Sequence, residues 1–123
     1  MKAFTSISSV LEYLKYLADY SGYIYSQKEI SEGDYNCIIN EIELFHRRIK
    51  EAGFITPILK KELLSINLNP MKKEFSLLSF FGFSYRSWDY PETNAVHQDK
   101  RRKNIWELKN HLDNIYTIIL LKS

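Results

Sequence analysis

Cysteine is nearly absent from this chain: Cys37 is the single one in 123 residues, so no disulfide can form within it. Free thiols of this kind are typical of reducing compartments. No window approaches the roughly 18 apolar residues that a membrane-spanning helix needs. The first ten residues, "MKAFTSISSV", carry a lysine without the apolar stretch that follows it in a signal peptide. We therefore expect a cytoplasmic protein without a membrane partner.

Recognisable catalytic and cofactor motifs are missing as well. The sequence contains no Gly-rich phosphate loop, Walker motif, nucleophile elbow or CxxC pair. Glu43 and His46 have the i, i+3 spacing of di-iron carboxylate bundles, but such sites need a second copy. The nearest similar pair, Glu107 and His111, is one residue too far apart. We expect no metal site and no cofactor.

Candidate acid–base residues are few. His97, Asp99 and Lys100 are close in sequence, but three neighbouring polar residues are explained more simply as the entry to a helix. Arg102 and His111 have eight residues between them, which turns them to different faces of a helix and argues against a joint role in RNA cleavage. We expect no catalytic residue.

Small side chains are also scarce, with only four alanines and four glycines, whereas 15% of the residues are aromatic. The core should therefore be bulky, and some of the nine tyrosines should remain in contact with water. The length fits a single helical domain over residues 1–123, long enough to form a core without disulfides or a structural metal.

The first helix is indicated by "TSISSVLEYLKYLADYSG", in which apolar residues recur at helical spacing up to Gly22. Tyr13, Tyr16 and Tyr20 follow the flank of its apolar stripe. Residues 23–33 are of mixed polarity and predict a loop, with at most one helical turn.

The second helix has the clearest pattern in the chain. Ser31 or Asp34 can cap its start, and Gly53 can adopt the left-handed conformation after its end. Its apolar residues step by three and four, which is the spacing of a seam that faces another helix. The seam consists of Tyr35, Ile38, Ile42, Phe45, Ile49 and Ala52.

Two shorter helices are each predicted from a capping residue followed by proline. Thr56 should cap a helix that begins at Pro57, and Asn69 should cap one that begins at Pro70. The latter helix should run to about residue 81. A strand is the alternative there, because Phe81, Phe83 and Tyr85 alternate with smaller or polar residues.

The last helix has a second seam with the same steps of three and four, formed by Ile105, Leu108, Leu112, Ile115 and Ile119. The two seams should pack against each other. Its apolar ending, "YTIILLKS", should be buried or lie against a partner. The sequence thus predicts a mostly α fold, a small helical bundle of four to five helices. An irregular, aromatic-rich loop is expected around 82–93, with a short strand or hairpin as the alternative.

The charges are unevenly distributed. Residues 1–45 carry three lysines and seven acids, a net −4, and residues 46–123 carry fourteen cations and eight acids, a net +6. The densest run is Lys100, Arg101, Arg102 and Lys103. A helix that began at this run would place four cations at its positive end. An earlier start, capped by Thr93 or Asn94, would instead put Arg101 on the core stripe, where its stem would have to snorkel.

Six aromatic residues and an arginine precede this run in "FFGFSYRSWDY". Such a segment could form a protein-binding hot spot, or it could stack on the bases of single-stranded nucleic acid. Alternatively, its rings could fill the open end of the bundle as part of the core. We predict a small non-catalytic interaction protein, such as an inhibitor, immunity protein or accessory subunit, that binds a protein partner through residues 80–103. RNA or single-stranded DNA binding by the same residues is the alternative, and an unrecognised small nuclease is a third hypothesis. The predicted contact residues are Phe83, Tyr85, Arg86, Trp88, Tyr90, Lys100, Arg101, Arg102 and Lys103.

Overall fold

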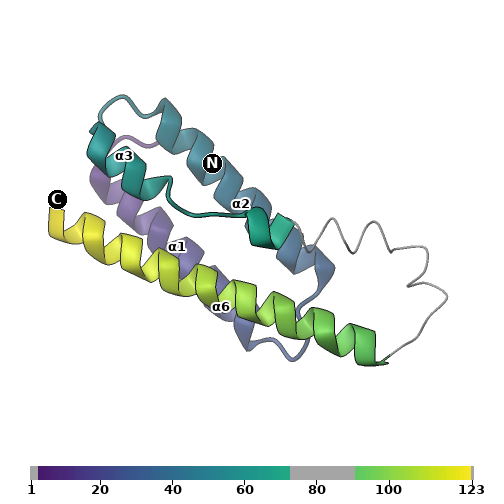
Figure 1. Cartoon of the computed structure of the whole chain (residues 1–123). Helices are drawn as coiled ribbons and strands as arrows, with labels where there is room; N and C mark the ends of the chain where they lie inside the picture. Colours follow the sequence, from purple (N-terminus) through teal and green to yellow (C-terminus); the bar gives the residue numbers. More distant parts are fainter. Residues whose placement is uncertain (1–2, 73–90, 123) are drawn as a thin grey trace.

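The computed structural model describes residues 3–72 and 91–122, and within these ranges the chain is helical and contains no strand (Figure 1). The helices are α1 (Ile7–Ser26), α2 (Glu32–Glu51), α3 (Pro57–Leu63) and α6 (Pro91–Lys122), and residues 69–72 form a further helical turn. The prediction of a mostly α, small helical bundle is confirmed.

The aromatic segment between the helices falls largely outside this description. The greater part of the predicted 70–81 helix, and the alternative strand or hairpin, lie in residues 73–90, outside the described residues. The predicted loop does end earlier than expected, because residues 91–93 already belong to α6.

The helix starts follow the predicted capping chemistry. Ser6 and Ser9 form a reciprocal capping box at the start of α1, each hydroxyl accepting the other residue's backbone N–H at 3.2 Å. Of the two candidates for α2, Ser31 is the cap, and its hydroxyl accepts the N–H of Asp34 at 3.0 Å. Thr56 caps α3, with Pro57 in its first turn.

Two predictions based on glycine are wrong. α1 does not end at Gly22 but continues to Ser26, so the predicted 23–33 loop shrinks to residues 27–31. A side chain at position 22 would place its Cβ 3.1 Å from Cε of Lys109, so the missing side chain leaves room for the Lys109 side chain of α6. Gly53 is not left-handed either, since no described glycine has a positive φ.

The start of the helical turn at 69–72 is displaced from its predicted position. Asn69 is already helical, and the C=O of Leu68 accepts the N–H of Lys72 at 2.9 Å. The side chain of Asn67 accepts the N–H of Asn69 at 3.0 Å, so Asn67 takes the role that the sequence assigned to Asn69.

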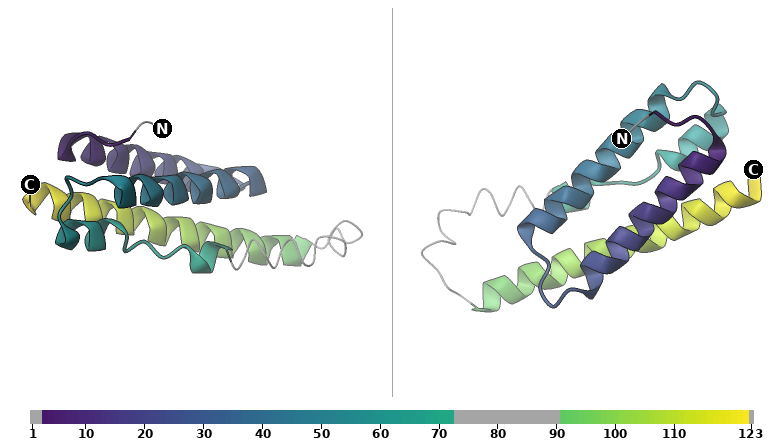
Figure 2. Two further views of the ribbon diagram at one scale, coloured as in Figure 1. Left: turned by 90° about the horizontal axis from the view of Figure 1, so that it is seen from above. Right: turned by 180° about the vertical axis from the view of Figure 1, so that it is seen from behind.

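Both predicted seams are buried along their whole length. The expectation that they pack directly on each other is wrong, because α6 runs antiparallel to α1 and packs chiefly along it (Figures 1 and 2). α2 packs on α1 from another side, and α3 contacts both α2 and α6. The two seams therefore contribute to one shared core, together with buried residues of α1 and α3, rather than forming a helix pair.

The C-terminal end of α6 is only partly buried. Ile119 is fully buried, but Leu120 and Leu121 are 51% and 81% exposed. Within the described ranges, no helix combines the length and apolarity that crossing a bilayer requires.

Candidate functional site

The basic run lies inside α6 rather than at its start, because the helix begins at Pro91. Arg101 is on the core stripe, as the earlier helix start required, and it is only 7% exposed. Its Nη1 donates to the backbone C=O of Ile30 at 2.9 Å, and its guanidinium carbon lies 5.9 Å from the ring centroid of Tyr35. A buried guanidinium is thus held by a carbonyl and an aromatic ring.

Arg102 binds the carboxyl end of α1. Its guanidinium donates to the backbone C=O of Tyr25, to that of Gln27 at 2.9 Å and to that of Lys28 at 3.1 Å. Carbonyls at a helix end have no partner within the helix, and the negative end of the helix dipole attracts a cation. Arg102 therefore satisfies and stabilises the end of α1.

Gln98 completes this contact with a two-way amide pair. Its Oε1 accepts the N–H of Ile30 at 2.7 Å, and its Nε2 donates to the C=O of the same residue at 3.0 Å. Gln98, Arg101 and Arg102 together form what we call the α6 clamp, which holds the α1–α2 loop. Of the four predicted cations, Lys100 and Lys103 are the ones left exposed.

The aromatic part of the predicted site cannot be placed, because Phe83, Tyr85, Arg86, Trp88 and Tyr90 lie outside the described residues. The same holds for the side chain of His97, one of the three residues considered above as an acid–base cluster and attributed to a helix entry. Its neighbours Asp99 and Lys100 are exposed on α6.

A second aromatic surface, which the sequence had indicated only as a helix flank, runs along α1. We call it the tyrosine face: Tyr13, Tyr16, Tyr20 and Tyr23. The ring centroids of Tyr13 and Tyr16 are 5.3 Å apart, and those of Tyr16 and Tyr20 are 5.9 Å apart. Tyr16 is 44% exposed and Tyr23 is 64% exposed. The residue steps of three, four and three place all four rings on one side of the helix.

The inner end of the tyrosine face is anchored in the core. The ring of Tyr13 stacks on that of Phe45, with centroids 5.9 Å apart and planes inclined by 8°. The Tyr13 hydroxyl donates to the carboxylate of Glu41 on α2. The aromatic row thus starts from a fixed ring, and Tyr16 and Tyr23 are its exposed members, whereas Tyr13 and Tyr20 are half-buried.

Two shallow depressions, of about 440 and 480 Å³, follow the tyrosine face. Three acids and one lysine line them, namely Glu12, Asp19, Glu41 and Lys15. Burial, followed by the hydrogen bond to Glu41, raises the pKa of Tyr13 well above its ordinary value. Burial also raises the pKa of Tyr16, as does Glu41. These hydroxyls therefore stay protonated at neutral pH, and the charge of the surface comes from its acids.

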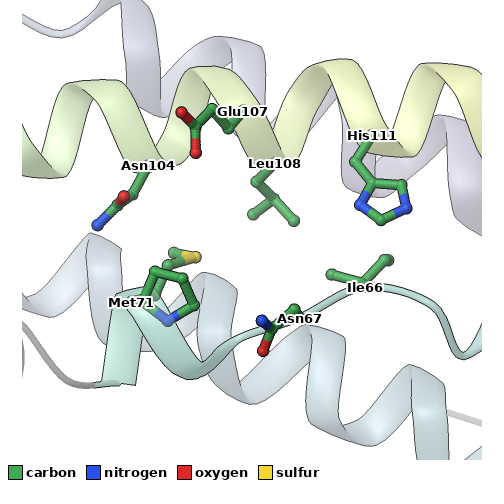
Figure 3. A pocket seen from close by; sticks show the side chains of 8 residues that line it. Ile66, Asn67, Met71, Asn104, Glu107, Leu108 and His111 are labelled. Atoms are coloured by element: carbon green, nitrogen blue, oxygen red, sulfur yellow. The ribbon is translucent and has the colours of Figure 1, made fainter.

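On another side of the bundle, α6 and residues 66–71 enclose a cavity of about 250 Å³ (Figure 3). Asn104, Leu108 and His111 extend from α6 toward this segment, whereas the Glu107 side chain lies along the helix (Figure 3). The lining comprises Ile66, Asn67, Pro70, Met71, Asn104, Glu107, Leu108 and His111. Mixed polar and apolar walls of this kind are common in ligand pockets.

Ser65 and His111 form a hydrogen-bonded pair beside this cavity, with 3.1 Å between Oγ and Nε2. The Ser65 hydroxyl donates its proton to the C=O of Glu62 at 2.6 Å. The imidazole must then donate to Oγ from Nε2, because a hydroxyl has one proton to give. A general base would have to accept at that nitrogen, so the pair is arranged as a structural contact and not as an activated nucleophile.

Of the Glu43–His46 pair, Glu43 is engaged in another contact. The carboxylate of Glu43 forms an ion pair with Lys72 at 2.7 Å. Burial lowers the pKa of His46, and Lys50 adds to this effect. Among the described side chains, those of residues 3–72 and 98–122, no three potential His, Cys, Asp or Glu ligands come together.

No protein-family model, curated protein or solved structure matches this chain. Its function has to be inferred from the surfaces described above.

Proposed function

We propose that this protein works by binding a protein partner, as a small inhibitor, immunity protein or accessory subunit, and that it catalyses no reaction. The observation that carries the proposal is the tyrosine face, where four tyrosines follow one side of α1, three of them in ring contact and two of them exposed, while the opposite side of the helix is buried. Tyrosine is among the residues that dominate binding hot spots.

The rings of this surface are partly ordered before any partner arrives. Tyr16 lies between Tyr13 and Tyr20, and Tyr13 is fixed by Phe45 and Glu41. Side chains that are already held lose less conformational entropy on binding, so more of the contact energy contributes to affinity. Tyrosine also offers a large contact area with few rotatable bonds.

The predicted 80–103 surface is retained as a second contact region in the proposal, with Lys100 and Lys103 as its exposed cations. Arg101 and Arg102 make their hydrogen bonds to the α1–α2 region, so we assign them to the stability of the fold. The absence of catalysis is supported by the Ser65–His111 geometry, in which the serine proton is directed to a backbone carbonyl.

The test is quantitative capture of a partner from nuclease-treated extract of the cells that make the protein, followed by affinity measurement with the purified partner. We expect Tyr16→Ser combined with Tyr23→Ser to weaken binding by about 30-fold or more, as loss of about 2 kcal/mol at a hot spot implies. Phe54→Ser is the matched control, because Phe54 is as exposed as Tyr16, at 44%, but lies outside α1. A partner retained equally by all three proteins would contradict the proposed surface, and capture lost on nuclease treatment would indicate nucleic acid.

A further inference from the structure

We infer that the tyrosine face binds a basic segment of its partner, a stretch of polypeptide that presents arginine or lysine side chains to the rings and to the acids beside them. This inference rests on the proposed function and specifies the class of partner. The acids that border the depressions outnumber the cations by three to one. A surface of this sign favours a positively charged partner through complementary potential.

The aromatic rings add a second means of attracting the same partner. A guanidinium or ammonium group that lies over a tyrosine ring interacts favourably with its π-electrons. The protein itself uses this interaction elsewhere, since Arg102 lies 5.5 Å from the ring centroid of Tyr25 and Arg101 lies over Tyr35. The protonated hydroxyls of the tyrosine face add no charge of their own, so attraction to a cation comes from the rings and the carboxylates together.

The spacing of the acids specifies how the cations should be arranged. Glu12 and Asp19 are seven residues apart on α1, which places them on the same side of the helix about 10 Å apart along its axis. Tyr16 lies between them. Two cations on one side of a peptide and about 10 Å apart correspond to residues i and i+3 of a polyproline II segment, which has three residues per turn and rises about 3.1 Å per residue. We therefore expect an extended peptide with a basic residue at every third position to fit the surface.

Lys15 provides an internal check on this inference, because it is the one cation that lines the depressions. It lies three residues after Glu12 and four before Asp19, so its charge opposes a basic partner at this point. Its replacement by alanine should strengthen binding of a cationic peptide about two- to five-fold.

The experiment is an NMR titration of the isotope-labelled full chain with a short, end-blocked peptide that has arginine at every third position and alanine or leucine elsewhere. The same peptide with glutamate in place of arginine is the control ligand. We expect saturable shifts confined to the amides of α1 and the facing side of α2, weakening as salt is added. Absence of saturable shifts with the arginine peptide, or equal binding of the glutamate peptide, would overturn the inference.

Matched variants separate charge from other causes. Glu12→Gln with Asp19→Asn should weaken binding of the arginine peptide about three- to ten-fold. Glu107→Gln with Asp99→Asn changes the same residue types, equally exposed, on α6, and should leave binding unchanged. If both pairs weaken binding equally, the attraction is to net charge and the inference fails. If the native partner depends on Tyr16 and Tyr23 but not on Glu12 and Asp19, the basic segment is refuted while the proposed function stands.

Discussion

Loss of the Arg102 guanidinium should destabilise the fold more than loss of any exposed cation in the same run. In Arg102→Met the apolar stem is kept, while hydrogen bonds to the three carbonyls of Tyr25, Gln27 and Lys28 disappear. Charged donors contribute about 1.5–3 kcal/mol each in dry surroundings, but Arg102 is half-buried and water can reach part of this site. We therefore expect a total loss of about 2 kcal/mol.

The matched control for this variant is Lys103→Met, which removes one positive charge from an exposed neighbour. Its free energy of unfolding should change by no more than about 0.5 kcal/mol. Urea unfolding followed by far-UV circular dichroism gives both values, and the m-value should be unchanged in each variant. Amide exchange at Ile30 should also accelerate in Arg102→Met, because the loop that contains it is freed. If the two variants unfold at the same urea concentration, the α6 clamp does not stabilise the end of α1 as we have argued.

Three further predictions follow from burial and charge. Aspartate at Ile42 or Leu112, both fully buried, should prevent folding at a cost of about 4 kcal/mol or more, and a cooperative thermal transition near the parent midpoint would show that the core is wrongly assigned. His46 has a lowered pKa, so protons bind the unfolded chain more readily and stability should fall as pH drops below about 6.5. His46→Gln should reduce that fall in urea titrations at pH 7.5 and 5.5, and an unchanged pH dependence would refute it. Lys100→Ala with Lys103→Ala should mainly slow association with a protein partner. If single-stranded nucleic acid is bound instead, anisotropy should show the log–log salt slope flattened by about 1.4.

The parts of the fold that depend on local spacing could be predicted from the sequence. The buried positions of α2 and α6 follow from steps of three and four, and Ser31 and Thr56 cap helices because their hydroxyls reach backbone N–H groups three residues ahead. Both features depend only on residues that are close together in the sequence.

The failures arise where distant residues decide the local structure. Gly22 resembles a helix stop, but α1 continues because Ile24 adds a buried position and Lys109 of α6 passes close to the glycine. Arg102 resembles part of a solvated basic patch, and only its carbonyl partners, 74 to 77 residues away, give it a structural role. The tyrosine spacing is readable in the sequence, but its exposure depends on which sides of α1 the other helices cover.

The α6 clamp also bears on the order in which the chain can fold during synthesis. Its hydrogen bonds join residues 68 to 77 positions apart. The α1–α2 loop therefore cannot form these bonds until α6 has been synthesised. At about 5–20 residues per second, the ribosome needs roughly 3–15 s to add that length of chain. Throughout this interval the apolar stripe of α1 lacks its main partner, because α6 is the helix that packs along it. The nascent chain thus displays a helical hairpin with an uncovered apolar side, the kind of species that chaperones bind and that aggregates when crowded.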